Sequence, residues 1–479
     1  MQDAELETLA AFVADFWKRQ GETGSLDPVA PRDVDRVLLE LRREPLPQAQ
    51  ASLDAALGLV SDLLEHHSVK TSHPLFLGYV TPPSLAIGAA GDAMAAIINQ
   101  NVSFAALSPI GSALESMVVG WLAEIVGFAD NAGGVLTSGG SEANLYALSV
   151  ARRKLLGPAA IVDGNRAEPD RRLRVYCSEH THHSIDKAAI MLGLGANGVK
   201  RLPADRNHHI RLDLLSAAIA EDEAGGAWRP MAIVANAGSR LCCAVDDIDA
   251  LRTLADRHNL WLHADGAYGA FLRLSRRPPQ NLAALGKADS VTIDPHKLLF
   301  VPFDCGSLIV RDARRLSECF AGEGEYLEPW TPPGLNDFAN LGMQLGRSMK
   351  ALKVWLVIKR LGAKALGEEY DRLIQLADYL VSLIKSEDTL ELLGPTGGTA
   401  VCFRWKGDGR VSEVDLRTRN AHVREQLIRS GAAFIDEVDV DGHRGFRVCM
   451  TNFRTTSNHL DRLVAVIGEL AQRAAIPRG

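Results

Sequence analysis

The stretch SVTIDPHKLLF, residues 290–300, joins a short apolar strand to a turn that carries a lysine. Its first four residues predict a buried strand, because β-branched residues favour strands. Pro295 lacks an N–H and cannot continue a central strand, so His296 and Lys297 should follow the strand end. Apolar residues come next. If they enclose Lys297, its amine is favoured in the neutral, nucleophilic form; a lysine that reaches water stays charged, and the stretch is compatible with both.

Strands of the same kind alternate with helical segments between residues 90 and 345. Such alternation predicts an α/β fold whose central sheet is mostly parallel and flanked by helices. The predicted strands are GGVLTS (133–138), LRVYCSE (173–179), MAIVANA (231–237), LWLHAD (260–265), SVTID (290–294) and GSLIV (306–310).

The pattern changes on both sides of this region, which predicts three domains. Residues 1–89 form an N-terminal helical segment, with helices at 6–20 and 53–67. Residues 90–345 form the large domain. Residues 346–479 form a smaller C-terminal α+β domain. The expected elements near and within it are a long helix near 344–362, strands in TAVCFRW and FRVCMTNF, and a closing helix at 457–475.

Composition restricts the class of protein. The chain has 479 residues, 47% of them hydrophobic, and a formal net charge of −7. No basic run predicts nucleic-acid binding, and we expect neither a membrane span nor a signal peptide. The seven cysteines are scattered and lack a C-x-x-C pair, which favours a reducing, cytoplasmic location.

Paired glycines end the first predicted strand of the large domain. In TSGGSEANLYAL, Gly139 and Gly140 precede Ser141 and a helical pattern. A glycine turn at a helix N-terminus presents free N–H groups and the positive end of the helix dipole, which suits a phosphate. A tight turn with Ser141 as the helix cap is the alternative.

A carboxylate ends the predicted strand LWLHAD, at Asp265. It needs a positive partner, such as a pyridinium N–H, unless it caps a helix or joins a structural ion pair. Gly266 and Ala267 leave room for a flat ring. Together the phosphate turn, Asp265 and Lys297 are what pyridoxal phosphate (PLP) requires: an anchor for its phosphate, a carboxylate for its ring nitrogen and a lysine for the Schiff base.

Three histidines lie in SEHTHHSIDKAA. On an extended segment His180 and His182 point the same way, and with Asp186 they suggest a metal site. No second cluster with ligand spacing completes such a site, so we expect no metal. A histidine that stacks on a ring and a surface histidine are the alternatives.

The chain resembles the group II PLP-dependent decarboxylases, the family of aromatic-L-amino-acid and glutamate decarboxylases. The resemblance rests on the motifs HPLFLGYV, LSPIGSALES, TSGGSEANLYAL, EHTHHSIDKAA, WLHADGAYGA, DSVTIDPHKLL and LGRSMKALKVW, over roughly residues 70–365. It implies PLP as cofactor, an L-amino acid as substrate, the PLP-dependent transferase fold of fold type I, and a homodimer with the active site at the subunit interface.

The resemblance also implies roles for residues around the cofactor ring. Lys297 is similar to the Schiff-base lysine, Asp265 to the partner of the pyridine nitrogen, and Ala267 to the residue behind the ring. His182 is similar to the histidine that stacks on the other face of the ring. Tyr326, in GEGEYLEPW, resembles the tyrosine that donates a proton from a mobile loop.

For the phosphate, the resemblance points to Gly140 and Ser141, with His296 beside Lys297. Asp294 stands where some relatives have an asparagine that contacts the phosphate. Near the substrate, Arg240 replaces a family threonine. With Asn101, Arg240 favours an acidic or polar substrate side chain, whereas Tyr79 favours an aromatic one.

Three alternatives share some of these residues. Another PLP-dependent lyase or an aminotransferase would use the same Lys297 and Asp265. A metal-dependent hydrolase would use His180 and His182. A non-catalytic scaffold protein is expected to have lost a principal site residue, and here each of those positions is occupied.

Overall fold

The computed structural model describes residues 2–21, 34–167, 170–322 and 333–473. The chain divides into two compact units. The first comprises residues 1–83, 376–393 and 401–479, and the second comprises residues 84–375 and 394–400. The predicted domain boundaries at 89 and 345 stay a prediction.

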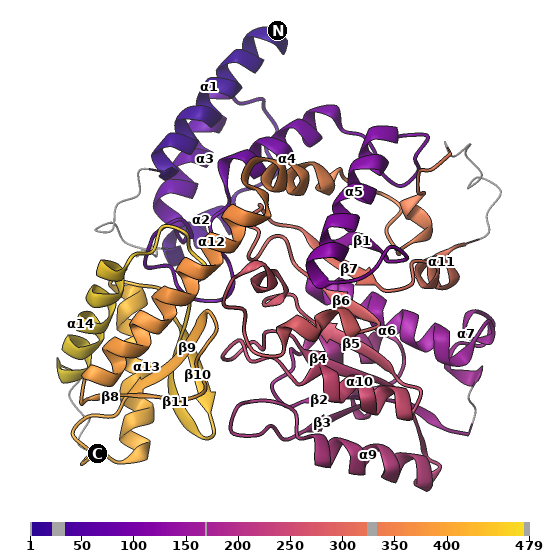
Figure 1. Ribbon diagram of the computed structural model, residues 1–479. Coiled ribbons are helices and arrows are strands. Elements are labelled where there is room, and N and C mark those ends of the chain that lie inside the picture. The colour runs from indigo at the N-terminus through magenta and orange to yellow at the C-terminus, as the bar shows by residue number, and fades with distance from the viewer. Residues whose placement is uncertain (1, 22–33, 168–169, 323–332, 474–479) are drawn as a thin grey trace. The chain divides into compact units, whose positions relative to one another are not determined.

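The second unit is built on a seven-stranded sheet, shown in Figure 1. The strand order is β1-β7-β6-β5-β4-β2-β3, and β7 alone runs antiparallel to its neighbours. All six predicted strands are present, so the mostly parallel sheet is confirmed. The strands are β1 (Gly133–Thr137), β2 (Arg172–Ser178), β3 (Val199–Leu202), β4 (Trp228–Asn236), β5 (Trp261–Asp265), β6 (Ser290–Thr292) and β7 (Gly306–Val310).

Helices alternate with these strands, as expected for parallel connections. They are α4 (Ala86–Ile98), α5 (Pro109–Val126), α6 (Gly140–Leu156), α7 (Ala159–Val162), α8 (Ser184–Met191), α9 (Leu212–Gly225), α10 (Ile248–Arg257) and α11 (Arg314–Phe320). Short 3₁₀ turns are η1 (Gly164–Ala167), η2 (Ala196–Gly198), η3 (Ala270–Leu274), η4 (Leu282–Lys287) and η5 (Phe338–Asn340).

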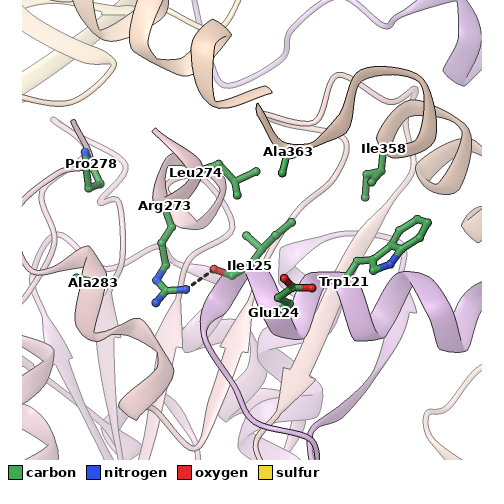
Figure 2. A pocket seen from close by; sticks show the side chains of 9 residues that line it. All are labelled: Trp121, Glu124, Ile125, Arg273, Leu274, Pro278, Ala283, Ile358 and Ala363. Atoms are coloured by element: carbon green, nitrogen blue, oxygen red, sulfur yellow. Dashed lines mark hydrogen bonds between the residues drawn. The ribbon is translucent and has the colours of Figure 1, made fainter. Parts of the chain in front are cut away.

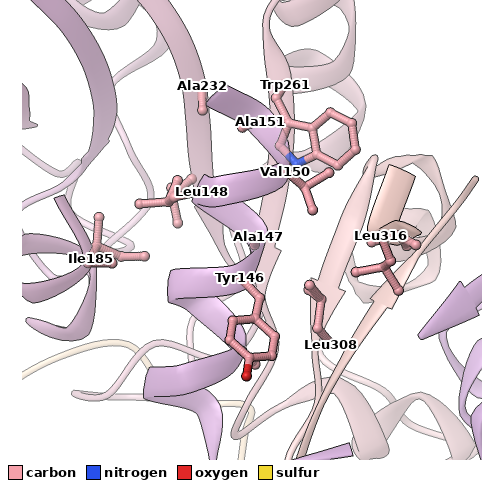
Figure 3. Close-up of a cluster of buried hydrophobic side chains, with 14 of the residues drawn as sticks. Tyr146, Ala147, Leu148, Val150, Ala151, Ile185, Ala232, Trp261, Leu308 and Leu316 are labelled. Carbon is pink, nitrogen blue, oxygen red and sulfur yellow. The ribbon is translucent and has the colours of Figure 1, made fainter. Parts of the chain in front are cut away.

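Helix α6 forms the centre of the core of this unit. Small residues at Ala143, Ala147 and Ala151 recur every fourth position and are buried, so the helix backbone approaches the sheet closely. Larger side chains fill the space on either side (Figure 3), including Tyr146 and Leu148. The helix that follows the glycine turn is therefore fixed firmly against the sheet.

The first unit contains helices and a second, smaller sheet. Its helices are α1 (Gln2–Gly21), α2 (Val34–Arg43), α3 (Leu53–His67), α13 (Glu413–Arg429) and α14 (Ser457–Arg473). Its sheet has the order β10-β11-β9-β8, with β8 (Leu390–Leu392), β9 (Ala400–Trp405), β10 (Asp436–Val440) and β11 (His443–Cys449). The predicted strands in TAVCFRW and FRVCMTNF and the closing helix are confirmed.

The long helix predicted near 344–362 differs from helix α12, which spans Lys350–Ser386. The chain before it is held by tertiary hydrogen bonds: the N–H of Arg347 donates to Asn101 Oδ1 at 2.9 Å, and its carbonyl accepts from Val102 N–H at 2.9 Å. These contacts replace the helical pattern. Helix α12 then continues past a break at Gly362, which has φ 72° and ψ 161°.

Helix α5 is long and apolar enough to cross a membrane by length and composition, although no membrane span is expected from the sequence. Eight of its residues are buried, among them Val118, Leu122 and Val126. The helix also packs against β1 and β7. It is therefore a core helix of the second unit.

Candidate active site

The predicted site residues follow the carboxyl ends of neighbouring parallel strands, where α/β sheets bind ligands. Strands β5 and β6 run in register, with His263 opposite Ser290 and Asp265 opposite Thr292. Because side chains alternate along a strand, these four residues share one face of the sheet. The sequence therefore forms a polar strip inside an apolar core.

The glycine turn lies against this polar strip. A Cβ at Gly140 would stand 2.9 Å from Asp294 Oδ2 and 3.0 Å from Ala267 Cβ, so only glycine fits. The N–H of Gly140 donates to Asp294 Oδ2 at 3.1 Å. Ser141 is exposed in the first turn of α6. The structure thus brings the predicted phosphate turn together with Ala267 and Asp294.

Lys297 is ion-paired, with its ammonium 3.2 Å from Asp294 Oδ2 and its side chain 23% exposed. The apolar residues that follow it are buried in the core and leave the amine paired. Of the two arrangements that the sequence left open, Lys297 therefore adopts the one that reaches water, with its amine paired to Asp294. Burial by itself raises the pKa of Asp294, but the charge of Lys297 and the hydrogen bond from His296 outweigh burial and hold that pKa below its ordinary value.

His296 is fixed by three contacts. Its Nδ1 accepts a hydrogen bond from Cys305 N–H at 3.1 Å, so its proton lies on Nε2, which stands 3.4 Å from Asp294 Oδ2. Its ring stacks on Phe303 with centroids 4.3 Å apart. His296 and Lys297 therefore converge on one buried carboxylate, whose second oxygen has no hydrogen-bond partner among the described residues.

Asp265 lies at the end of β5 and is 9% exposed. Its Oδ1 accepts from Ala267 N–H at 3.2 Å, and its Oδ2 accepts from Asn144 Nδ2 at 2.9 Å. Two neutral donors orient the carboxylate without neutralising it. It is thus prepared to meet a positive partner.

His182 lies close enough to Asp265 and Lys297 for their charges to change its pKa. Burial lowers the pKa of His182, Lys297 and Arg240 lower it further, and Asp265 opposes the decrease. His182 Nδ1 accepts from Ser184 N–H at 3.2 Å and lies 2.9 Å from Ser184 Oγ. The imidazole is therefore neutral near pH 7.

Sequence reasoning missed the buried residues that connect these groups, namely Asn144, Ser184, His263, Ser290 and Thr292. A signal was present in the sequence. His263 is two positions from Asp265 on an apolar strand, which places both on one face. A polar asparagine among buried alanines on α6 is the second signal.

The residues expected near the substrate occupy different places. Arg240 is exposed in the loop after β4 and acts electrostatically on His182. The Asn101 side chain accepts from Arg347 N–H and Ser103 N–H, and it donates to the carbonyl of Leu345, so it braces two loops.

Tyr79 belongs to the first unit. It has φ 54°, and its N–H donates to Asp436 Oδ2 at 2.9 Å. Its side chain is exposed beside Phe434. Tyr326 lies outside the residues that the structure describes, so its predicted role stays a prediction.

The metal alternative finds no arrangement of ligands within the described parts of the chain, where no group of three His, Cys, Asp or Glu side chains is placed to hold an ion. Asp186, its third ligand, is paired with Arg201 instead, at 2.6 Å. His180 lies against the ring of His208, with centroids 4.5 Å apart.

A cavity of about 470 Å³ lies between α5, η3 and α12 (Figure 2). Trp121, Ile125 and Leu274 are among its lining residues, and Arg273 donates to the Ile125 carbonyl at 2.7 Å. It includes none of the predicted site residues. The candidate site is therefore the end of the sheet around Lys297.

The residues at the end of the sheet around Lys297 fit PLP. A glycine turn at a helix N-terminus suits its phosphate, a paired lysine suits its aldehyde, and an oriented carboxylate suits its ring nitrogen. The unpartnered buried oxygen of Asp294 marks the same end as polar.

Comparison with known proteins gives independent evidence. The family model described as pyridoxal-dependent decarboxylase conserved domain matches residues 37–406. An aromatic-L-amino-acid decarboxylase of Bacillus atrophaeus is 30% identical over 451 residues, which is 94% of this chain and 92% of the relative. An L-2,4-diaminobutyrate decarboxylase of Rhizobium meliloti is 29% identical, over 90% of this chain and 84% of the relative. The crystal structure of mouse CSAD in its apo form superposes with a TM-score of 0.91 at 28% identity and covers 98% of this chain and 99% of that one.

Proposed function

The chain belongs to the pyridoxal-dependent decarboxylase family, and we propose that its substrate is an L-amino acid with an acidic side chain. It is a PLP-dependent amino-acid decarboxylase, which releases carbon dioxide and leaves the corresponding amine. The observation that carries the substrate class is Arg240. Its guanidinium lowers the pKa of His182, and it follows the carboxyl end of β4, so a carboxylate on the substrate side chain has a partner there.

Each site residue has a proposed task. Lys297 carries the cofactor, and the turn at Gly140 and Ser141 holds its phosphate beside His296. Asp265 would pair with the ring nitrogen, and Ala267 and His182 would contact the two faces of the ring. When bound, PLP supplies an electron-withdrawing ring that accepts the electrons left as carbon dioxide departs.

Tyr326 is proposed as the acid that delivers a proton to Cα after carbon dioxide leaves. The Tyr326→Phe variant should release carbon dioxide with less amine, because Cα that is not protonated in time would react with dioxygen, and aldehyde, ammonia and hydrogen peroxide should then appear in place of the missing amine. Carbon dioxide, amine and peroxide are measured in one reaction. Equal yields of amine and carbon dioxide without peroxide would exclude Tyr326 as that acid.

Substrate choice is tested with a panel of L-amino acids: glutamate, aspartate, cysteine sulfinate, 2,4-diaminobutyrate, tyrosine and tryptophan. We expect kcat/KM to be highest for an acidic member. Arg240→Thr should lower that value by at least about tenfold, since a charged hydrogen bond contributes about 1.5–3 kcal/mol. Arg240→Lys, the matched control, keeps the charge and should retain the ranking. An unchanged ranking in Arg240→Thr would leave Arg240 a cofactor or structural role.

An aromatic substrate is the second candidate. It is favoured by the Bacillus atrophaeus relative at 30% identity and by the aromatic side chain of Tyr79. The same panel separates the two candidates, because the highest kcat/KM would then belong to tyrosine or tryptophan.

A homodimer is proposed from the apolar stripe of α1, and the family resemblance adds to this proposal an active site at the subunit interface. Leu6, Leu9, Val13 and Trp17 recur at helical spacing and are exposed in the single chain. Sedimentation should show a dimer, and Leu6→Asp with Val13→Asp should weaken it. Val414→Asp changes an exposed valine outside the stripe and should leave the dimer intact. A double variant that sediments as the wild type would exclude this stripe as the interface.

A cytoplasmic location is also proposed, since all seven cysteines are free.

A further inference from the structure

Asn144 stands at the centre of the buried polar groups and is 1% exposed. Its Nδ2 donates to Asp265 Oδ2 at 2.9 Å and to Ser184 Oγ at 2.8 Å. Its Oδ1 accepts from Thr292 Oγ1 at 2.7 Å and from His263 Nε2 at 2.9 Å. Both donors and both acceptor positions of the amide are therefore used.

The orientation of this amide follows from its neighbours. A carboxylate only accepts hydrogen bonds, so the nitrogen of Asn144 must face Asp265. The oxygen of Asn144 then faces His263, whose Nε2 must carry the proton. A flipped amide would set two acceptors against each other beside Asp265, at the cost of an unmade buried hydrogen bond.

The hydrogen bonds at Nδ1 of His263 agree with a proton on its Nε2. Trp261 Nε1 donates to Ser290 Oγ at 2.8 Å, and Ser290 Oγ lies 2.8 Å from His263 Nδ1. Ser290 can therefore donate to Nδ1 of a neutral His263. Burial lowers the pKa of His263 to about 4, which keeps the ring neutral.

The other arm of the amide leads to His182. Ser184 N–H donates to His182 Nδ1, so that nitrogen is an acceptor and the proton of the neutral ring lies on Nε2. The hydroxyl of Ser184 accepts from Asn144 and can donate to the same Nδ1. The amide thereby fixes the direction in which the Ser184 hydroxyl points.

We propose that Asn144 is a positioning residue for the decarboxylation, because one amide orients the carboxylate of Asp265 and, through Ser184, the imidazole of His182. This inference rests on the proposal that Asp265 and His182 contact the cofactor. Two groups assigned to the ring nitrogen and to the ring face are thus held by one buried side chain.

The first test observes the cofactor ring nitrogen directly, by NMR of enzyme loaded with ¹⁵N-labelled PLP. In Asn144→Ala, Asp265 loses one of its two donors and its fixed direction. The ring-nitrogen signal should move toward the unprotonated position. We expect kcat to fall roughly 10- to 100-fold, as for residues that orient a ligand through a hydrogen bond, with KM little changed.

The second test needs no cofactor: it follows the titration of His182 by NMR in the ligand-free protein. Hydrogen bonds donated to Nδ1 favour the neutral ring, so Ser184→Ala should raise the pKa of His182. Asn144→Ala should raise it as well, although Ser184 is still present. Ser184→Ala alone should leave the ring-nitrogen signal nearly unchanged, because Asp265 keeps its contact with Asn144.

Ser149→Ala is the matched control. Ser149 is a buried polar residue of the same helix, and its hydroxyl donates to the Leu145 carbonyl at 2.7 Å, away from the site. It should change neither signal. Asn144→Ser is made in parallel, in case the alanine variant does not fold, since its hydroxyl cannot reach Asp265 and Ser184 together.

The proposal is overturned if the Asn144 variants match Ser149→Ala in both signals and differ from the wild type only in the free energy of unfolding. Neither NMR signal depends on which amino acid is the substrate. A wrong substrate assignment therefore fails in the substrate panel, whereas a wrong role for Asn144 leaves both NMR signals and the kcat of the Asn144 variants unchanged.

Discussion

At the scale of single residues, the site is a set of buried charges held by precise partners. Asp294 accepts a hydrogen bond from the Gly140 N–H and lies next to the ammonium of Lys297. Asp265 receives only neutral donors. The first carboxylate is therefore paired with a cation, whereas the second is oriented by neutral donors, and this difference fits their separate proposed tasks.

Lys297 is expected to be the attachment point of the cofactor. Reduction of the loaded enzyme with borohydride should fix a pyridoxyl group on the peptide that contains Lys297, as measured by mass spectrometry. Lys297→Ala should abolish turnover and still bind PLP, because the phosphate turn remains. Lys350, a lysine that pairs with Asp304, is the control position for alanine substitution. Label on any other lysine would end the assignment.

Asp265→Ala should raise the barrier of the chemical step by at least about 3 kcal/mol, since it removes a preorganised charge from beside the ring nitrogen. Asp265→Glu should recover part of the rate. The measurement is the rate constant of a single turnover, with cofactor content determined separately. Near-normal turnover in Asp265→Ala would make this residue structural.

Asp294→Asn should tighten PLP binding by roughly tenfold, about 1.4 kcal/mol, because it removes a buried negative charge from the turn that faces the phosphate. The amide keeps the shape and can still accept from Gly140. The dissociation constant is measured by titrating PLP into the ligand-free protein. Asp312→Asn, a half-buried carboxylate paired with Arg314, serves as control. Weaker binding in Asp294→Asn would show that the carboxylate supports the turn more than it repels the phosphate.

At the scale of elements, the register of β5 and β6 and the small-residue face of α6 create the site together. The register aligns Asp265 with Thr292, and the alanines of α6 bring Asn144 down onto both strands. A one-residue shift of either strand would send these side chains to the opposite face of the sheet. The apolar core around them fixes that register.

The break in α12 at Gly362 permits a further prediction at this scale. Its φ of 72° and ψ of 161° suit glycine, and no atom lies within 4 Å of the place that the Cβ of an alanine would take. Gly362→Ala should therefore lower the free energy of unfolding by roughly 1–3 kcal/mol through backbone strain alone. Urea denaturation measures it. Gly468→Ala, within α14 and also without close neighbours, should be neutral or slightly stabilising. Equal effects at both positions would contradict the strain.

At the scale of the whole molecule, buried titrating groups make stability depend on pH. The pKa of His263 is about 4 in the folded chain and about 6.5 in the unfolded one, so the unfolded chain binds more protons between these values. Stability from His263 is therefore lost as pH falls from about 6.5 to about 4. Asp246 acts oppositely: burial raises its pKa to about 6, so its contribution falls as pH rises from about 4 to about 6.

We expect the wild type to lose roughly 2 kcal/mol more than His263→Gln between pH 7 and pH 5, measured as the free energy of unfolding in urea. Asp246→Asn should shift the pH dependence in the opposite sense. The comparison between variants isolates His263 from the other groups. Identical pH dependence in the wild type and His263→Gln would mean that the pKa of His263 is the same in the folded and the unfolded chain.

The positions of the six main strands along the chain, and those of Lys297, Asp265 and the glycine turn, could be predicted from the sequence. Apolar runs with β-branched residues report local preference, and the residues that end them carry the chemistry. The six main strands and the α/β class followed from those runs. Strands β3, β8 and β10 escaped, because charged residues interrupt their apolar pattern.

Only the tertiary structure decided which polar groups meet. The pairing of Lys297 with Asp294, the join of Asn144 to Asp265 and His182, and the start of α12 at Lys350 depend on contacts between residues far apart in the chain. A local pattern records the preference of one segment for helix or strand, but the partner of a buried polar atom is set by the register of neighbouring strands and by how closely a helix packs on them.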